Sequence, residues 1–491
     1  MTFDATTGLV LREGTIFERS RAGRKGFQLP DPKVPRVRPK GFTRKAAAEL
    51  PEVSELDVVR HFTRLSSWNY AIDLGTFPLG SCTMKYNPRI NEEIAALPGL
   101  TDIHPDFPPA YVQGALEILF TLEKILAKIA GLDAVSLEPA AGAQGEFTGL
   151  SVIRTFHERH GSDRKLVLIP DTAHGTNPAS CTLAGYKIAP LKSSQKGALG
   201  KEAVDEAIRT HGRNIAALMM TNPNTLGLFE TQIADIAESL HEIGAQLYMD
   251  GANMNAILGV ARPGDMGVDV MQYNLHKTFS TPHGGGGPGA GPIAVRSHLA
   301  PYLPAPRVVR NDQGQFDLSY PEESIGKVKG GMGNFGVLVR ALTYILHHGS
   351  AGLKEISHAA VLNANYIKRR LCEHYALPVE GPSFHEVVFS DAKQTPHGIK
   401  TLQIAKALID RGFHPPTIYF PLVVSGALLI EPTETESIAE LDKLIDAFID
   451  IAQLVAKDEK FENVPTKPIV GKVDEVRAAR TPVLTLDDRG Q

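Results

Sequence analysis

The sequence predicts an α/β fold with a mostly parallel sheet covered by helices, followed by a smaller C-terminal α+β domain. Short continuous apolar runs alternate with helical patterns between residues 131 and 296, which is typical of parallel strands buried on both faces. Beyond Gly336 the order changes to one long helical stretch and then isolated strands and helices. The 491 residues are enough for two or more packed domains.

The individual elements follow from local patterns. Apolar residues at helical spacing between Pro109 and Gly131 predict a helix with proline at its start and glycine at its end. Apolar runs predict strands at 134–139, 165–170, 214–221, 245–250, 268–274 and 291–296, with helices from Asn177 and over 231–244. In the smaller domain we expect helices over 335–371, 401–412 and 435–457, and strands over 385–390 and 427–432.

These patterns divide the chain into four parts. Residues 1–60 form an extended arm, 61–335 a large domain, 336–457 a small domain and 458–491 a surface tail. The arm is basic, rich in proline and poor in periodicity, so it cannot build a core of its own. Two interpretations stay open for it: a disordered segment, or a segment that lies across another subunit.

Composition excludes several classes of function. The net charge of −4 gives no general electrostatic basis for binding nucleic acid. We find no apolar run long enough for a membrane span and no secretory signal at the start. Three scattered cysteines, Cys82, Cys181 and Cys372, fit neither a disulfide framework nor metal-ligand spacing. We therefore expect a cytoplasmic protein without a metal site.

One lysine, Lys277, stands just before a run of glycines in "YNLHKTFSTPHGGGGPGAGP". A phosphate-binding loop would place the glycines before the lysine, which is the opposite order. A solvated lysine on a surface loop is the simplest alternative. The third interpretation is a lysine that forms a Schiff base with a carbonyl cofactor, with glycines that let other groups approach closely.

The residues that follow the predicted strands favour the third interpretation, because ligands of open parallel sheets bind at the carboxyl ends of the strands. The first such segment opens a helix with Gly142, Ala143, Gln144 and Gly145, whose amides can hold a phosphate. His174 follows the second strand as a flat ring. Each of these features alone also has a purely structural explanation.

Three further strand ends continue the series. Asn222 and Thr225 lie in a turn after the strand 214–221, Asp250 ends the next strand, and Lys277 follows one strand later. Pyridoxal phosphate needs such a set: an anion site, a flat surface for its ring, a donor to its ring oxygen, an acid for its ring nitrogen and an amine for its aldehyde. Five matches in order predict a pyridoxal phosphate site.

Several motifs also resemble one family of pyridoxal-phosphate enzymes. This family belongs to fold type I, which is the aspartate-aminotransferase-like fold. The motifs are "LGSCTMKYNP", "EPAAGAQGE", "AHGTNPASC", "MTNPNTLGLFE", "YMDGANMNA", "NLHKTFSTPHGGGGPG" and "IEPTETES". They resemble glycine dehydrogenase (decarboxylating), the P-protein of the glycine cleavage system. The chain has about half the length of the one-chain form and carries the lysine, so it resembles subunit 2 of the two-subunit form.

The resemblance implies the reaction and the partners. Glycine would displace Lys277 from the cofactor and lose carbon dioxide, and the aminomethyl group would pass to the lipoyl arm of the H-protein. The partner would be a homologous subunit 1, with two copies of each chain. Asp250 would keep the ring nitrogen protonated, and His174, His276 and His283 are possible acids.

Alternatives remain at this level. The absence of arginine between Gly412 and Val476 favours decarboxylation over transamination, although Arg340 could still bind a carboxylate. Another fold-type I decarboxylase or a sulfur-transferring lyase is possible, with Cys82 as the loop cysteine that a lyase of this kind needs. A scaffold subunit without catalysis is the alternative outside the enzyme class.

Overall fold

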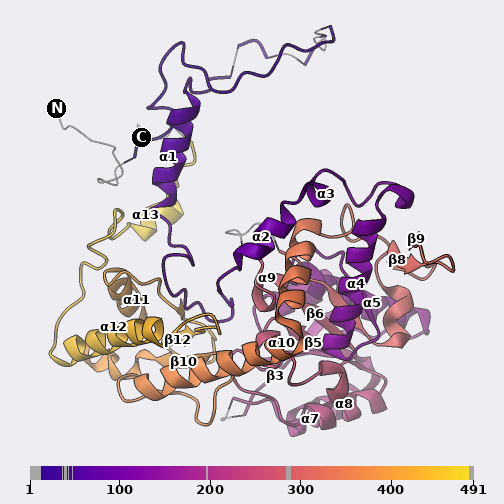
Figure 1. Cartoon of the computed structure of the whole chain (residues 1–491). Helices are drawn as coiled ribbons and strands as arrows, with labels where there is room; N and C mark the ends of the chain where they lie inside the picture. The colour runs from indigo at the N-terminus through magenta and orange to yellow at the C-terminus, as the bar shows by residue number, and fades with distance from the viewer. Residues whose placement is uncertain are drawn as a thin grey trace, which may run out of the picture. The chain divides into compact units, whose positions relative to one another are not determined.

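The computed structural model describes residues 13–35, 37, 41, 42, 44–46, 48–194, 197–283 and 289–485 (Figure 1). They fall into two compact units: Gly75–Glu462, here the larger unit, and Met1–Leu74 together with Asn463–Gln491, the smaller unit. These breaks differ from the limits at residues 60 and 457 expected from the sequence, and the larger unit is not divided at residue 335. The four-part division therefore stays a prediction.

The larger unit is built on a sheet that, within the described residues, has seven strands in the order β1-β7-β6-β5-β4-β2-β3. The strands are β1 (Ala134–Ser136), β2 (Leu166–Pro170), β3 (Lys187–Leu191), β4 (Ile215–Thr221), β5 (Gln246–Gly251), β6 (Val270–Tyr273) and β7 (Ile293–Val295). Strands β2 to β6 pair in parallel, and β7 is antiparallel to both β1 and β6. The predicted fold class is confirmed.

Strand β3 was not predicted, and its position explains why. It lies at the edge of the sheet, paired only with β2. Lys187 and Pro190 are exposed on it, so the segment lacks the continuous apolar run of the central strands. Lysine and proline are typical of edge strands, where a free backbone donor is not needed and a charge discourages further pairing.

Helices cover both faces of this sheet, and the side chains of the strands alternate between the two cores. Leu168, Leu218 and Leu247 belong to the core shared with α4 (Gln113–Ala130), α8 (Ile233–Glu242) and the first half of α10 (Phe335–Leu371). Val167, Ala217 and Tyr248 belong to the opposite core, shared with α5 (Gly142–Arg159) and α6 (Thr176–Leu183). The period of two along each strand produces this alternation.

Helix α10 (Phe335–Leu371) leads from this sheet into a second, smaller sheet with the order β10-β12-β11. Its helical geometry is interrupted at Gly349, where φ is 61° and ψ is −177°. The strands are β10 (Val387–Ser390), β11 (Thr417–Ile418) and β12 (Ala427–Ile430), covered by α11 (Thr401–Ile409) and α12 (Ile438–Ala456) around a separate apolar core. The predicted α+β region is confirmed.

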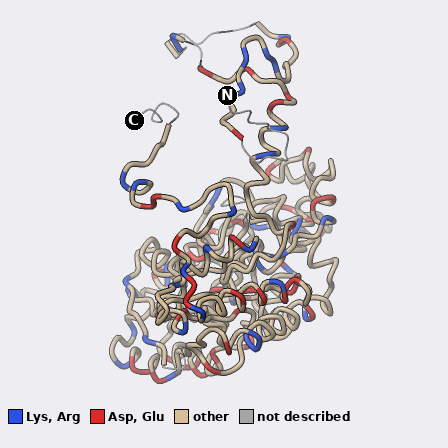
Figure 2. Tube along the Cα trace, turned by 90° about the vertical axis from the view of Figure 1, so that its left-hand side faces the viewer, with Lys and Arg blue, Asp and Glu red and all other residues tan. Residues whose placement is uncertain are grey.

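Remaining elements are α1 (Glu55–Ser66), α2 (Arg89–Ala95), α3 (Pro98–Thr101), α7 (Lys201–His211), α9 (Leu275–Thr278) and α13 (Glu475–Arg480), with the hairpin β8 (Arg307–Arg310) and β9 (Phe316–Ser319). In the smaller unit, Ser54 and Asp57 form a capping box that fixes the start of α1. No helix in the described part of the chain combines the length and the apolar character that a membrane span requires. Figure 2 shows basic and acidic residues interspersed along the trace of the larger unit.

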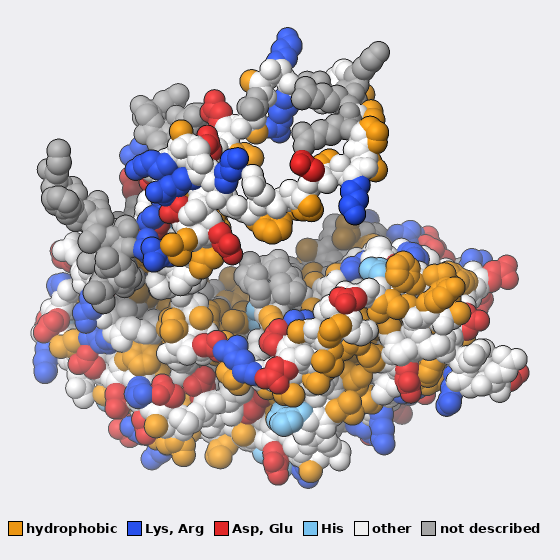
Figure 3. All heavy atoms as spheres, turned by 45° about the horizontal axis from the view of Figure 1, so that its top comes forward, with side chains coloured by type: hydrophobic (Ala, Val, Ile, Leu, Met, Phe, Trp, Pro, Cys, Tyr) orange, Lys and Arg blue, Asp and Glu red, His pale blue; other side chains and the backbone are white. Residues whose placement is uncertain are grey.

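The segment 86–111, which carries α2 and α3, exposes large apolar side chains in this single chain. They are Tyr86, Ile90, Leu97, Phe107 and Tyr111. Figure 3 shows a broad group of apolar side chains on one face of the molecule. Apolar patches of this kind on soluble proteins often mark surfaces for protein partners.

Candidate active site

The carboxyl ends of the parallel strands bring most of the sequence-predicted residues to one edge of the main sheet. His174 follows β2, Asn222 follows β4, Asp250 lies near the end of β5, and Lys277 lies on α9 directly after β6. Thr221 at the end of β4 pairs in register with Asp250 on β5. The sequence spacing therefore predicted this convergence correctly, although the cofactor roles of these residues stay predictions.

Asp250 is a buried carboxylate whose hydrogen-bond donors, among the described residues, are neutral groups. Its side chain is 2% exposed. One oxygen accepts from the backbone N–H of Ala252 at 2.9 Å and from the amide of Gln272, and the other accepts from Asn177 Nδ2 at 2.9 Å. These donors fix its orientation but do not balance a negative charge, so the group fits the protonated ring nitrogen of pyridoxal phosphate.

Lys277 lies in the short helix α9, which directly follows β6. Its Nζ donates a hydrogen bond to the carbonyl oxygen of Ser81 at 2.6 Å. The side chain is half-buried, so the amine is shielded but accessible. The run Gly284–Pro288, for which we expected an open approach to the lysine, lies outside the described residues.

The glycine-rich start of α5 packs closely against the strands that carry the other groups. The helix begins at Gly142, and the first-turn amides of Gly142, Ala143 and Gln144 have no acceptor inside a helix. A Cβ atom on Gly145 would lie 2.5 Å from the carbonyl oxygen of Gly291, and one on Gly142 would lie 2.7 Å from the side-chain nitrogen of Asn274. The glycines thus allow this helix start to sit over the end of β6.

Gln144 offers a phosphate its backbone N–H, because both polar ends of its side chain already make hydrogen bonds. Its side-chain oxygen accepts from the backbone of Ala140 at 2.7 Å, and its side-chain nitrogen donates to the carbonyl of Val328 at 2.7 Å. The side chain therefore holds the loop before α5 in place. A phosphate at this position would be bound by backbone amides and the positive end of the helix dipole.

Replacement of Gly145 by alanine should destabilise the larger unit by about 1–3 kcal/mol, because the methyl group would overlap the backbone of Gly291. The matched control is Gly114→Ala near the start of α4, where a Cβ atom would meet nothing within 4 Å. This control should be neutral or slightly stabilising. Urea unfolding of both variants, followed by circular dichroism, measures the difference. Equal stabilities would show that the close approach at Gly145 is unimportant.

Asn222 and Thr225 lie in the same turn, but they differ in what they can still bind. Thr225 Oγ1 donates to the carbonyl of Thr172 at 2.7 Å, so its hydroxyl proton is already used to hold the loop after β2. Asn222 is fully buried and accepts from the backbone of Glu230 at 2.9 Å. Its Nδ2 has no hydrogen-bond partner among the described residues. Asn222 therefore retains a donor that fits the anionic ring oxygen of the cofactor.

His174 is held by the start of α6. Its Nδ1 lies 2.8 Å from Thr176 Oγ1 and accepts from the backbone N–H of Thr176 at 3.2 Å. Burial lowers the pKa of His174, and the positive charge of Lys277 lowers it further. The ring is thus neutral near pH 7 and fits the expected role of a flat surface against the cofactor.

Two other histidines considered as proton donors are also neutral. Burial lowers the pKa of His276 to about 3 and that of His283 to about 4. A histidine with such a pKa is almost never in its cationic, acidic form at neutral pH. These two side chains are therefore poor candidates for the acid of the reaction.

Several residues of the site were missed by the sequence analysis. Glu146 on α5 accepts from Thr176 Oγ1 at 2.7 Å and from Ser180 Oγ at 2.8 Å. Burial raises its pKa to about 7, and the charge of Asp250 adds to this effect. The sequence shows only a glutamate near the start of a predicted helix. A glutamate at such a position usually stabilises the helix by interacting with its dipole.

Arg340 does not supply a free guanidinium for a substrate carboxylate. It donates through two nitrogens to both oxygens of Glu92, each at 2.8 Å. This bidentate pair joins α10 to α2. Arg340 could bind a substrate carboxylate only after its ion pair with Glu92 had broken. Arg340 is therefore a poor candidate for this role.

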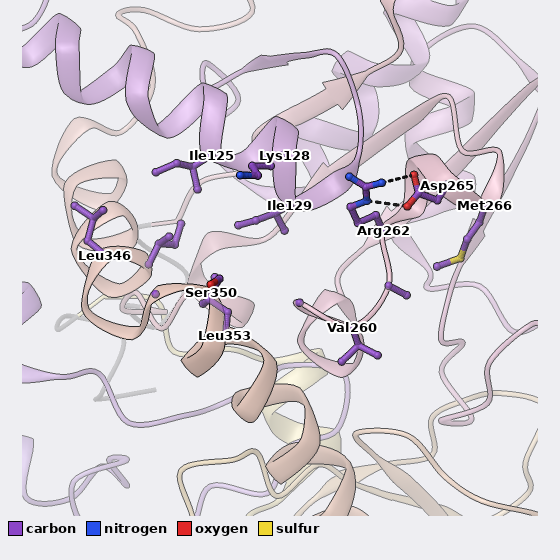
Figure 4. Close-up of a pocket in the computed structure, with 14 residues that line it drawn as sticks. Ile125, Lys128, Ile129, Val260, Arg262, Asp265, Met266, Leu346, Ser350 and Leu353 are labelled. Atoms are coloured by element: carbon purple, nitrogen blue, oxygen red, sulfur yellow. Dashed lines mark hydrogen bonds and ion pairs between the residues drawn. The ribbon is translucent and has the colours of Figure 1, made fainter.

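A pocket of about 730 Å³ lies elsewhere in the larger unit, between α4, the segment 259–266 and the kink of α10 (Figure 4). Its walls are mainly apolar, including Ile125, Ile129 and Leu353. Its acidic side chain, Asp265, is engaged by the guanidinium of Arg262 at 2.7 Å and 2.9 Å. Lys128 also lines this pocket, but none of the cofactor residues expected from the sequence does, so we do not assign the chemistry to it.

Comparison with known proteins shows the family of the chain. Residues 29–314 match the family described as glycine cleavage system P-protein, and residues 356–469 match the family described as glycine dehydrogenase, C-terminal domain. The chain is 51% identical over 477 residues to the probable glycine dehydrogenase (decarboxylating) subunit 2 of Listeria monocytogenes serotype 4a, covering 96% of this chain and 97% of that protein. It is 52% identical over 480 residues to the protein of the same name from Halalkalibacterium halodurans, covering 96% and 98%.

Solved structures show the same fold at lower identity. A crystal structure of glycine decarboxylase (P-protein) of the glycine cleavage system, in inhibitor-bound form, has a TM-score of 0.69 and 20% identity, over 86% of this chain and 92% of that one. A cysteine desulfurase from Thermococcus onnurineus has a TM-score of 0.59 and 15% identity, over 76% and 94%. With the family match over more than half of its length, the chain belongs to the glycine cleavage system P-protein family.

Proposed function

We propose that the chain is the cofactor-binding subunit of a glycine dehydrogenase (decarboxylating). It removes carbon dioxide from glycine and delivers the aminomethyl group to a lipoyl carrier. The observation that carries the proposal is the convergence of Asp250 and Lys277 at adjacent strand ends, in a chain that matches relatives named for this activity over 96% of its length.

The cofactor is pyridoxal phosphate, which when bound supplies an aldehyde for the lysine and a ring that accepts the electron pair left by carbon dioxide. The residues of this chain supply the remaining functions. Asp250 would hold a proton on the ring nitrogen, and Asn222 Nδ2 would donate to the ring oxygen. The amides of Ala143 and Gln144 would bind the phosphate, and Lys277 would provide the amine. The N–H of Gly145, which the sequence analysis also expected at the phosphate, instead donates to the carbonyl of Ala141 at 2.9 Å.

A sulfur-transferring lyase is disfavoured by the state of Cys82. This cysteine lies in the loop beside Lys277, which is where a persulfide-forming thiol would be needed. Burial raises its pKa, so the thiol stays protonated at neutral pH. A reactive cysteine needs a depressed pKa and access to solvent. The likeness to desulfurases at 15% identity is therefore a likeness of fold.

The partners in this proposal are a homologous subunit 1, with two copies of each chain, and a lipoylated H-protein that binds transiently. The name subunit 2 carried by the relatives supports a second chain. The exposed apolar segment 86–111 provides a surface for it. The proposal keeps the cytoplasmic location, which the three free cysteines support.

The isolated chain should bind pyridoxal phosphate but show little or no glycine–bicarbonate carbon exchange, even with H-protein present. Addition of subunit 1 should restore the exchange. The measurement is radiolabelled bicarbonate exchange with each chain alone and with both. Full activity of the isolated chain would contradict the two-subunit proposal. If the chain mixed with pyridoxal phosphate shows no visible absorbance band of bound cofactor, the scaffold alternative is favoured.

A further inference from the structure

Two glutamates and a histidine form a buried cluster on the side of Lys277 that faces the small sheet. Glu386 directly precedes β10 and Glu431 directly follows β12. Because Val387 and Ile430 pair in the antiparallel register, the two glutamates lie opposite each other. Both are 0% exposed, as is His385, and one ligand-capable atom of each lies within 4.8 Å of the others.

The two carboxyl groups hold the loop on which Lys277 rests. Glu386 Oε2 accepts from the backbone N–H of Ser81 at 2.7 Å. Glu431 accepts from the backbone N–H of Thr83 at 3.1 Å and from its hydroxyl at 2.6 Å. The carbonyl of Ser81 is the acceptor for Lys277 Nζ. The hydrogen bonds of the two glutamates therefore fix the loop 81–83, and the Ser81 carbonyl of this loop accepts from the reactive amine.

The conformation of this loop requires such support. Ser81 has a φ of 62° and Thr83 a φ of 48°, both in the left-handed region. Residues other than glycine adopt this backbone conformation at a cost in free energy. The cost is larger for Thr83, because its side chain is β-branched. The carboxyl groups of Glu386 and Glu431 offset this cost by binding the two backbone N–H groups that the loop turns towards them.

The hydrogen bonds distinguish the charge states of the two acids. Both oxygens of Glu431 accept hydrogen bonds from Thr83, which suits an ionised carboxylate. Glu386 Oε1 has no partner within the described ranges and lies 3.6 Å from His385 Nε2. A proton on Glu386 Oε1 would therefore point towards the neutral ring nitrogen of His385. A proton on Glu431 would instead occupy an oxygen that already accepts a hydrogen bond from Thr83.

Electrostatics supports the same assignment. Burial raises the pKa of Glu386 well above its usual range, and the neighbouring Glu431 raises it further. Burial also raises the pKa of Glu431, to about 7, against the favourable bonds from Thr83 and the charges of Lys277 and Lys85. Burial lowers the pKa of His385 to about 3, so its ring is neutral. Two adjacent buried carboxyl groups hold one proton more readily than none.

We propose that Glu386 is a neutral carboxylic acid and Glu431 an ionised one in the working enzyme, and that together they position the Ser81 carbonyl against Lys277. Both are positioning residues, because they act on the amine through the loop 81–83. The inference rests on the proposed function only in that Lys277 holds the cofactor. In this assignment the pair of glutamates carries a single negative charge, on Glu431, which balances the cation at Lys277.

The assignment is tested with Glu386→Gln and Glu431→Gln. Glutamine is the neutral isostere of a protonated glutamate, and its amide can still accept from Ser81. Glu440→Gln is the control, since it removes a charge from a partly exposed position of the same small-sheet region. The infrared difference spectrum at neutral pH between wild type and Glu386→Gln should contain the carbonyl band of a protonated carboxyl group. The difference spectrum for Glu440→Gln should lack that band.

A second readout is the pH midpoint of the visible absorbance of the chain loaded with pyridoxal phosphate. Glu431→Gln should lower this midpoint by about 1 unit or more, because an anion that favours the protonated form is removed. Glu386→Gln should leave the midpoint within the range of the control. A lowered midpoint in Glu386→Gln, or an infrared difference spectrum without the carboxyl band, would overturn the assignment.

Both readouts are independent of glycine turnover. They distinguish failure of this inference from failure of the proposed function, which would instead appear as absent carbon exchange in the wild-type complex. If Glu431→Gln does not fold, as judged by its circular dichroism, the infrared measurement on Glu386→Gln still decides where the proton lies.

Discussion

Replacement of Lys277 by alanine should lower glycine–bicarbonate exchange by about 10⁴-fold or more, because the amine of Lys85, the other lysine beside α9, is held by Glu434 and by the carbonyl of Thr278. The fold should persist, since the side chain contributes one hydrogen bond, to the carbonyl of Ser81. The measurement is carbon exchange in the complex with subunit 1 and H-protein, with circular dichroism to confirm folding. Lys187→Ala on the exposed edge strand is the control and should retain full activity.

Chemical labelling tests the same assignment without reference to turnover. Borohydride reduction of the loaded wild-type chain should attach the cofactor to the peptide that contains residues 274–280. Lys85 is the alternative amine, but its Nζ is held by Glu434 at 2.7 Å and by the carbonyl of Thr278 at 2.8 Å. Recovery of the label on Lys85, or on any lysine other than Lys277, would refute the assignment.

Asp250→Asn should lower the rate of exchange by about 10²–10³-fold, corresponding to roughly 3–4 kcal/mol of barrier. An amide can accept a hydrogen bond, but it cannot balance a positive charge on the ring nitrogen. The carboxylate already lies in place between Asn177, Gln272 and the backbone of Ala252, so the loss removes a preorganised charge. The comparison of kcat with cofactor affinity separates catalysis from binding.

A matched control is available for this change. Asp171→Asn alters an exposed aspartate in the loop after β2, where the side chain accepts from Ser193. It should leave exchange unchanged. Near-normal exchange in Asp250→Asn, with the cofactor still bound, would remove Asp250 from the role of ring-nitrogen partner.

The parts of the fold that the sequence predicted are those with strong local signals. Central strands such as β4 are continuous apolar runs, and their ends place Asp250 and Lys277 at one edge of the sheet by topology alone. The helix expected from Pro109 instead starts at Gln113, after a single 3₁₀ turn. Its end at Gly131 was predicted correctly, because the glycine adopts the left-handed conformation that ends a helix.

Tertiary contacts decided what the sequence could not. Asn222 and Thr225 had equal standing as candidates, but the Thr225 hydroxyl binds Thr172 whereas the Asn222 amide keeps a donor. Glu386 carries no local signal, and Glu431 lies in the motif "IEPTETES" without any role assigned to it from the sequence. Only the folded chain shows that both acids hydrogen-bond the loop 81–83, which lies near the start of the larger unit in the sequence.

The loop from Ser81 to Thr83 also constrains when the site can form. Its bonds reach residues 196, 305 and 348 positions further along the chain. Contacts at such separations form late, because a long loop must close before the contact repays its entropy. At about 5–20 residues per second, a ribosome needs tens of seconds to reach Glu431 after it has made this loop. Cofactor loading therefore follows synthesis of nearly the whole larger unit, and the cofactor stabilises a state that is already folded.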